Sequence, residues 1–528
     1  MTSNTDQTDD ISVPWGDPAD AQGTWTFDAM HTPDVMTPLG FDLYWDPFIS
    51  GFREGISLRY VNYYVFVDWM RPPIPTWTSE EVLKNLAPAW SRWRDKAIPE
   101  LQGLFEYYRR TDFDRLSNTA LADEIDRLRK TRPRQGRLHS LTLGPWMMAM
   151  NLLMDIYKEL VGGDDVAAIR LVQGYSNKSV EAGHELWDLS KLAASLPTVR
   201  ETLMQVTSES ALQSLAGLER EPDAEPFLSA FASYLDEYGW RTDLNEMATP
   251  TWAEDPTIPL CQLRTYLEMG HYDPKEEMKR LGEERDEAIL QAMSSLRPED
   301  RARMDAVLDI ATELAPIQED HNYYIDQRLA NIPRRLVLAA GRRLADGTLS
   351  DPADVFYLRE SEVRSALAGE DSDYADLVGS RRSEMARWAS VTPPAFVGTP
   401  PPDSEDLHRR FWGEHRLRSD QPNVLPGNGG SAGVATGPAR VLMNLGEASR
   451  LKRGDVLVAR TTLPPWTPLF ALTSAIVVET GGILSHAAVT AREYGVPAVL
   501  GVTDATRLIR DGQLIEVDGA KGRVRILS

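Results

Sequence analysis

One histidine in this sequence is placed where it could carry a phosphoryl group. His486 lies within TGGILSHAAVTAREYGVPAVLG, residues 480–501, after the apolar run SAIVVE. That run predicts a buried strand, the two glycines end it, and Ser485 is a good N-cap residue, so His486 is expected in the first turn of a helix. Free backbone N–H groups and the positive end of the helix dipole favour an anion there. Because neutral imidazole is a nucleophile near pH 7, His486 can accept a phosphoryl group and pass it on. The alternative is a helix-capping histidine in an ordinary small α/β domain.

The motif resembles TGG-x-x-SH-x-A-x-x-AR-x-x-G-[IV]-PAV-x-G of the swivelling phosphohistidine domain of phosphoenolpyruvate-utilising enzymes. The matching positions are Thr480, Gly481, Gly482, Ser485, His486, Ala491, Arg492, Gly495, Pro497, Ala498 and Gly501. The resemblance implies that His486 is the catalytic carrier. It also implies that Thr480, Gly481, Gly482, Ser485 and Arg492 stabilise the phosphoryl group.

The rest of the C-terminal hundred residues predicts a small α/β domain. The segment 429–442 is a Gly-rich entry into a strand, 455–460 is a second strand, and 513–527 is typical of a hairpin turned at Asp518-Gly519. SAGVATGPARV and TTLPPWTPLF also resemble segments of the swivelling domain. In pyruvate-forming members of the family a phosphoenolpyruvate-binding barrel follows this domain. Because nothing follows Ser528, we do not expect a self-contained enzyme that uses that substrate.

Length and composition set further limits. With 528 residues, 42% of them hydrophobic, the chain is long enough for two or three domains with real cores. A formal net charge of −23 argues against nucleic acid or an anionic membrane surface as a partner. The single cysteine, Cys261, cannot form an intrachain disulfide, the acidic start is no signal peptide, and no apolar run approaches the ~20 residues of a membrane span. We expect a soluble cytoplasmic protein.

Three parts are expected: a mainly helical domain (1–391), a Pro-rich linker (392–428) and a swivelling phosphohistidine domain (429–528). Apolar residues recur at three- and four-residue spacing over 78–110, 119–131, 143–161, 164–193, 198–218, 224–238, 276–294, 298–330 and 332–346. SLRYVNYYVFVDW (57–69) predicts a strand pair or buried hairpin, in a segment expected to wrap the helical body. A Pro-rich linker would let the C-terminal domain swing, although a passive spacer would have the same composition.

The helical part resembles the acceptor-binding domain of rifampin phosphotransferase and of phenylphosphate synthase. The segments that carry this resemblance are 24–39, 171–190, 234–256 and 320–358. The sequence contains no G-x-x-x-x-G-K-[ST] and no G-x-G-x-x-G opening a βαβ unit, so we expect no ATP site and no bound cofactor in this chain. The resemblance implies a separate ATP-grasp subunit that holds ATP and Mg²⁺. No metal site is expected here.

Candidate acceptor-side residues are polar side chains set among aromatic ones. They are His31, Arg241, Asp243, Glu246, His321 and Arg328, with Trp240 and Tyr324 as aromatic walls. His321 is the expected base, unless it is a solvated helix histidine. Arg241 and Glu246 could equally form a structural ion pair. Trp240 stands where the family often has histidine, which would suit a flat, apolar acceptor.

The expected function is that of a phosphotransferase component. The partner subunit would phosphorylate His486 from ATP, and His486 would pass the phosphoryl group to the hydroxyl of a small aromatic substrate such as phenol or cresol. The alternatives are an antibiotic or natural-product acceptor, and a non-catalytic binding module of the same fold.

Overall fold

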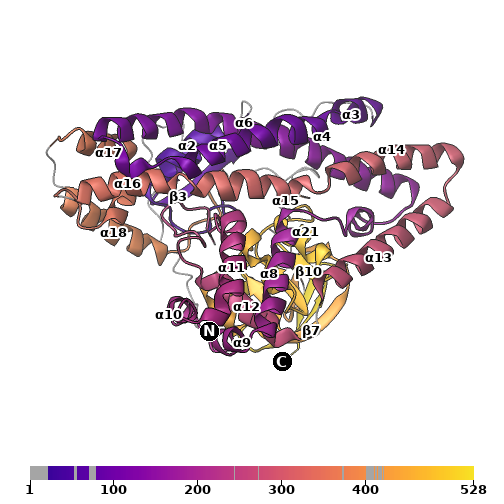
Figure 1. The fold of residues 1–528 in the computed structure, drawn as a ribbon. Helices are drawn as coiled ribbons and strands as arrows, with labels where there is room; N and C mark the ends of the chain where they lie inside the picture. The colour runs from indigo at the N-terminus through magenta and orange to yellow at the C-terminus, as the bar shows by residue number, and fades with distance from the viewer. Residues whose placement is uncertain are drawn as a thin grey trace, which may run out of the picture.

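The computed structural model describes residues 22–527, apart from 53–55, 70–78, 243, 271–272, 346, 371–373, 400–409, 411–412, 414–418 and 420. Long helices of the helical body, among them α6 (Asn118–Leu160), span the upper part of the view in Figure 1, and the C-terminal α/β part lies beneath them. The chain is therefore multidomain, mostly helical in its N-terminal part and α/β in its C-terminal part.

The longest helix is α6 (Asn118–Leu160), of 43 residues, and it contains Pro133 and Pro145. The helical pattern found over 119–131 and 143–161 is confirmed, and the helix also continues through the residues between them. The helix α2 (Asp46–Ser50) lies so close that a Cβ at Gly136 would stand 1.9 Å from the carbonyl oxygen of Phe48. This tight packing holds the segment between the prolines in one helix, although an interior proline removes a backbone hydrogen bond.

The helical body contains many other helices. The first half comprises α1 (Pro38–Gly40), the π-helix η2 (Phe41–Trp45), α3 (Ser79–Leu86), α4 (Ala89–Arg92), η3 (Trp93–Ala97), α5 (Ile98–Arg110) and α7 (Asp165–Ile169). The second half comprises α8 (Lys178–Ser195), α9 (Pro197–Leu203), α10 (Ala211–Leu218), α11 (Glu225–Tyr238), α12 (Thr257–Met269), α13 (Pro274–Ser294), α14 (Pro298–Leu314), α15 (Ile317–His321), the π-helix η7 (Asn322–Leu329), α16 (Arg334–Ala345), α17 (Glu360–Leu367) and α18 (Tyr374–Ala389). Short 3₁₀ turns join several of them.

A small antiparallel sheet, in the order β2-β3-β1-β4, packs on the helical body. Its strands are β1 (Thr24–Phe27), β2 (Ile56–Val61), β3 (Tyr64–Trp69) and β4 (Phe396–Gly398). The hairpin predicted within 57–69 is confirmed, with the turn at Asn62 and Tyr63, which both adopt positive φ. Strand β4 belongs to the segment expected as a linker, and it pairs with β1.

The C-terminal part is built on an eight-stranded sheet in the order β5-β12-β11-β7-β8-β9-β10-β6. Its strands are β5 (Val424–Pro426), β6 (Asn428–Ser431), β7 (Val434–Val441), β8 (Val456–Ala459), β9 (Ala475–Val478), β10 (Ala498–Leu500), β11 (Leu514–Asp518) and β12 (Arg523–Ile526). Strands β7 to β10 run parallel and the others are antiparallel to their neighbours. The strands predicted after residue 428 are confirmed. Helices α20 (Thr467–Phe470), α21 (His486–Glu493) and α22 (Ala505–Leu508) cover the sheet.

The two parts share an apolar interface. Buried side chains of α8, α11 and α12 belong to one hydrophobic cluster with those of α20, α21 and the inner strands of the large sheet. Figure 1 shows these three helices in front of the C-terminal sheet, and α21 near α15. The contact brings the start of α21 against the helical body. Among the described helices, none combines the length and hydropathy of a membrane span.

Candidate phosphohistidine site

Helix α21 begins at His486, as the sequence predicts, and Ser485 occupies the N-cap position. Its side chain makes no capping hydrogen bond, and its buried Oγ has no hydrogen-bond partner among the described residues. Gly481 adopts φ +91°, and a Cβ on it would stand 2.6 Å from that Oγ. The loop therefore requires glycine at this position, and it leaves a free hydroxyl beside the histidine.

A carboxylate from the helical body holds the imidazole of His486. Nδ1 lies 2.8 Å and 2.9 Å from the two carboxylate oxygens of Glu319, in the middle of α15. Glu319 is 1% exposed and also accepts a hydrogen bond of 2.6 Å from Ser179 Oγ. Burial raises the pKa of Glu319, but His486 outweighs it and the pKa lies below its usual value. The ionised carboxylate only accepts, so Nδ1 carries the proton and Nε2 keeps the reactive lone pair.

One cavity joins His486 to the helical body. Its volume is about 60 Å³, which is room for a few water molecules and less than the roughly 300–1,000 Å³ typical of small-molecule sites. From the C-terminal part it is lined by Thr461, Thr462, Leu463, Pro464, Pro465, Thr480, Gly481, Ser485, His486 and Ala487. From the helical part it is lined by Met30, His31, His139, Leu143, Thr242, Asn245, Gln318, His321, Asn322, Asp326, Gln327 and Asn331. A bound acceptor would therefore lie between the carrier and a largely polar wall.

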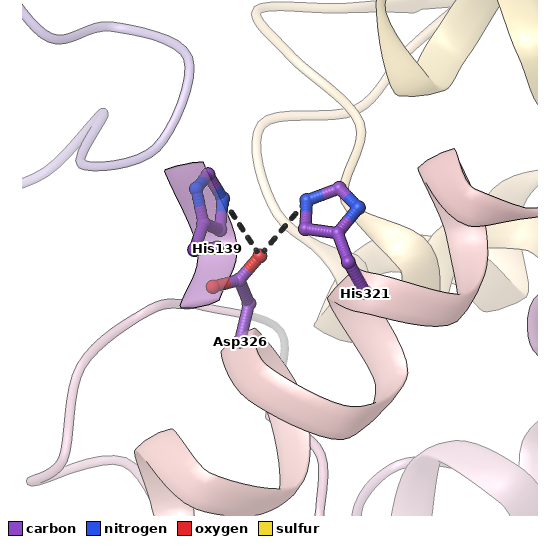
Figure 2. Close-up of side chains that lie close together, drawn as sticks. All are labelled: His139, His321 and Asp326. Atoms are coloured by element: carbon purple, nitrogen blue, oxygen red, sulfur yellow. Dashed lines mark ion pairs between the residues drawn. The ribbon is translucent and has the colours of Figure 1, made fainter. Parts of the chain in front are cut away.

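Two histidines on that wall flank one carboxylate (Figure 2). Nε2 of His321 lies 3.5 Å, and Nε2 of His139 3.8 Å, from Oδ2 of Asp326. Nδ1 of His321 lies 3.0 Å from the carbonyl oxygen of Ile317, so Nδ1 donates and Nε2 keeps its lone pair. Burial lowers the pKa of His139 well below its usual value and raises that of Asp326. His139 is therefore neutral near pH 7.

His31 completes the polar wall. Its Nδ1 lies 2.9 Å from Oδ1 of Asp28, and its ring lies beside Trp45. Burial lowers the pKa of His31, but Asp28 outweighs burial, and the pKa is raised overall. His31 and His321 are thus the two predicted acceptor-side residues that the structure brings to the cavity.

Three other predicted acceptor-side residues pack elsewhere in the helical body. Trp240 packs edge-on against Phe105, and Tyr324 lies edge-on to Trp93. Arg241 packs over the rings of Tyr238 and Trp252. None of the three lines the cavity, because each is held in an aromatic cluster of the helical body.

The carboxylate of Glu246 also has a structural role. It accepts hydrogen bonds from the backbone N–H and the hydroxyl of Thr37, both 2.8 Å long, and from the N–H of Ala248. The ion pair with Arg241, which was the alternative to a functional role, is not formed. Arg328 packs over Phe105 and also lies away from the cavity. Asp243 lies outside the described residues.

The predicted phosphate-stabilising residues of the motif around His486 also divide into those that line the cavity and those that do not. Thr480, Gly481 and Ser485 line the cavity, and the carbonyl oxygen of Gly482 closes the turn by accepting from the N–H of Ser485 at 3.0 Å. Arg492, expected to stabilise the phosphoryl group, instead donates to the carbonyl oxygens of Gly430 and Ile483 at 2.7 Å and 2.9 Å. It points away from the cavity and holds together the loops that support α21.

A second group of contacts fixes the far end of α21 against the helical body. The carboxylate of Glu493 accepts from the N–H of Gly174 at 2.9 Å, and burial raises its pKa to about 8. A smaller cavity here is lined by Trp146, Met150, Tyr175 and Asn177, together with Arg492 and Glu493. The segments GYSN (174–177) and LTLGPWMMAMN (141–151) therefore contribute mainly to this contact, although Leu143 lines the larger cavity.

Sequence reasoning missed Glu319, His139 and Asp326. In an α-helix His321 would share a face with the residue four positions on, which is Ile325. The chain instead enters the π-helix η7 after His321, and i→i+5 hydrogen bonding brings Asp326, five positions on, beneath it. Only Glu319 left a signal, since QEDH places two adjacent acidic residues directly before His321.

Comparisons with known proteins agree with this geometry. Residues 138–319 match the rifampicin phosphotransferase fourth domain, and residues 451–522 match the mobile domain of PEP-utilising enzymes. The chain belongs to the PEP-utilising enzyme family. The first match ends at Glu319, and the second contains His486. The chain resembles rifampicin phosphotransferases in particular.

Three relatives illustrate the range of similarity. The chain is 33% identical to chondramide synthase of Chondromyces crocatus over 98% of its own length but 14% of that protein. It is 32% identical to an uncharacterised phosphotransferase, YvkC, of Bacillus subtilis over 73% of this chain and 46% of the relative. It is 31% identical to rifampicin phosphotransferase of Streptomyces sviceus over 71% of this chain and 43% of the relative. The chain thus spans less than half the length of each.

Proposed function

We propose that this chain is the acceptor-side component of an ATP-dependent phosphotransferase that acts through phosphohistidine at His486. One observation carries the proposal: the hydrogen bond from Nδ1 of His486 to Glu319 leaves Nε2 as the reactive nitrogen at a cavity shared with the helical body. The intact motif and the family membership support a transfer function over a non-catalytic binding module.

The transfer step follows from this geometry. The acceptor hydroxyl attacks phosphorus, the P–Nε2 bond of phosphorylated His486 breaks as the O–P bond forms, and Nε2 leaves as neutral imidazole. The hydroxyl proton passes to Nε2 of His321, whose lone pair is free and whose ring is held by the Ile317 carbonyl. Ser485 Oγ and the N–H groups at the start of α21 are placed to stabilise the phosphoryl oxygens.

The acceptor we propose is a hydroxyl of a natural product. The expected flat, apolar pocket rested on Trp240 and Tyr324, which pack elsewhere, whereas the cavity wall is rich in histidine, asparagine, glutamine and threonine. Relatives are named for rifampicin, chondramide and prodigiosin. A simple phenol or cresol remains the second candidate, because the ring of His31, which packs beside Trp45, gives the cavity one aromatic edge.

The phosphoryl group would come from ATP bound with Mg²⁺ on a separate ATP-grasp subunit. The present contact of α21 with α15 would then be the transfer state, and the C-terminal part would have to leave it to be loaded. The part of the Pro-rich segment between β4 and β5, residues 399–423, is the proposed tether for that motion, since β4 pairs with β1 and β5 belongs to the large sheet.

Chemical loading tests the proposal without the partner. Phosphoramidate phosphorylates reactive histidines, so the whole chain should gain one acid-labile, base-stable phosphoryl group, detected by intact mass. The His486→Ala variant should gain none at this site, while His184→Ala, which changes a histidine of α8 outside the cavity lining, should behave like the wild type. The loaded protein should then phosphorylate a hydroxyl compound from a panel of rifamycins, phenols and other natural products. A stable label at His486 that no acceptor discharges would favour the binding module, and turnover by His486→Ala would contradict the carrier.

A further inference from the structure

The three side chains drawn in Figure 2 come from different elements and lie around one point. His139 is on α6, His321 ends α15, and Asp326 is on η7. Each offers one ligand atom, and these atoms all lie within 4.8 Å of one another. All three residues line the cavity that His486 shares.

The distances between the side chains of these three residues fit ligands of one metal ion better than direct hydrogen bonds. Two nitrogen or oxygen atoms bound to one zinc ion at about 2.1 Å with tetrahedral angles lie roughly 3.4 Å apart. The Nε2 atoms of His321 and His139 lie 3.5 Å and 3.8 Å from Oδ2 of Asp326, which is longer than a hydrogen bond. The carboxylate therefore lies between two imidazoles without a close hydrogen bond to either.

The surroundings of the two rings also fit metal ligands. The Ile317 carbonyl accepts from Nδ1 of His321, which is the outer contact that fixes a ligating histidine with Nε2 free. Nδ1 of His139 is buried and has no hydrogen-bond partner among the described residues. The nearby Arg132 donates to Gln135 and to the Leu329 carbonyl, not to Asp326. A buried carboxylate with two imidazoles and no direct cationic partner among the described residues is a donor set that a divalent cation would satisfy.

We propose that His139, His321 and Asp326 bind one divalent transition-metal ion of the zinc class. Two imidazoles with one carboxylate favour zinc and its neighbours over Mg²⁺, which prefers oxygen ligands. Three protein ligands leave at least one coordination position free, and the cavity is the space into which it would open.

The role of the metal ion in phosphoryl transfer rests on the proposed function. A metal-bound acceptor hydroxyl loses its proton more readily, and the resulting alkoxide or phenolate attacks phosphorus on His486. With the ion bound, Nε2 of His321 is a ligand, and the proton leaves to water or to His31 instead. No metal site is predicted from the sequence, because His139 lies far from the other two residues, and His321 and Asp326, five positions apart, do not share a face of an ordinary α-helix.

Metal binding is measured first, independently of transfer. The full chain is stripped with a chelator and titrated with Zn²⁺, and in parallel with Co²⁺ followed by its visible spectrum. We expect one equivalent, and we expect Asp326→Asn, His139→Gln and His321→Gln each to weaken binding by at least about 100-fold, since loss of outer contacts alone costs about 10- to 100-fold. His184→Gln is the matched control for histidine content and should bind like the wild type.

Further variants distinguish a loss of metal binding from a loss of folding and from a loss of phosphoryl transfer. Asp326→Asn keeps the side-chain shape, and thermal unfolding of the apo proteins checks that each variant folds. His486→Ala should keep the metal equivalent and lose transfer, which distinguishes failure of the carrier from failure of the site. Absence of a bound equivalent in the wild type, or unchanged binding in Asp326→Asn, overturns the metal site. Undiminished transfer from loaded, chelator-stripped protein overturns the role of the ion.

Discussion

The carboxylate of Glu319 belongs to the helical part of the chain, yet it determines which nitrogen of His486 can react. Replacing it by the amide in Glu319→Gln removes the charge and lets the amide donate to Nδ1, which favours the other tautomer. We expect transfer from chemically loaded protein to slow by at least about 100-fold, since loss of the orienting carboxylate in a catalytic triad costs about 10,000-fold. The measurement is single-turnover decay of the phosphohistidine with acceptor present.

Asp320, which follows Glu319 in the sequence, provides a matched control substitution. The carboxylate of Asp320 accepts from the N–H of Lys178 and makes no hydrogen bond to His486, and burial raises its pKa to about 7. Asp320→Asn should therefore leave the decay nearly unchanged at pH 8. Equal effects of the two substitutions would mean that Glu319 acts through the stability of α15 and not through the tautomer.

At the scale of elements, the loop before α21 depends on one glycine. Gly481 adopts φ +91°, where an alanine costs about 1 to 2 kcal/mol, and its Cβ would contact Ser485 Oγ. We expect Gly481→Ala to lower the free energy of unfolding by at least that amount and to lower phosphorylation of His486. Gly217→Ala, at an exposed site in α10 with open space around it, should instead stabilise by up to about 1 kcal/mol. Denaturant unfolding measures both, and a neutral Gly481→Ala would contradict the strained turn.

The sequence could predict the part of the site that is formed by local structure. The strand, glycine turn and helix around His486 are local, and the hydrophobic period and turn residues specify them. The acceptor side depends on contacts between distant segments: Glu319 reaches His486 only because α15 packs against α21, and Asp326 reaches His321 only through a π-helix. Trp240, Arg241 and Tyr324 were predicted from the resemblance of their segments and from polar residues set among aromatic ones, and neither distinguishes an aromatic core from an aromatic pocket.

Across the whole molecule, the contact between the two parts should depend on pH through Glu493. Its carboxyl is buried against the N–H of Gly174, beside Arg492, Arg285 and Glu319, and burial raises its pKa to about 8. If separation of the parts returns Glu493 to water, its pKa falls to the usual range. The protonated form then favours the contact. This contribution is fully present below the ordinary carboxyl pKa and is lost as pH rises through about 8.

Small-angle scattering of the full chain between pH 5 and 9 tests this dependence. We expect the radius of gyration to increase as pH rises through the upper part of that range, because the charged carboxylate resists burial and the C-terminal part separates from the helical body more often. In Glu493→Gln, which stays neutral and retains an oxygen acceptor for the N–H of Gly174, the increase should be largely absent. Asp320→Asn should retain it, since that carboxylate is bonded within the helical part. An identical increase in Glu493→Gln would assign the dependence to another group, and no increase in the wild type would mean that the apolar contacts shared by α8, α12 and α21 hold the parts together throughout.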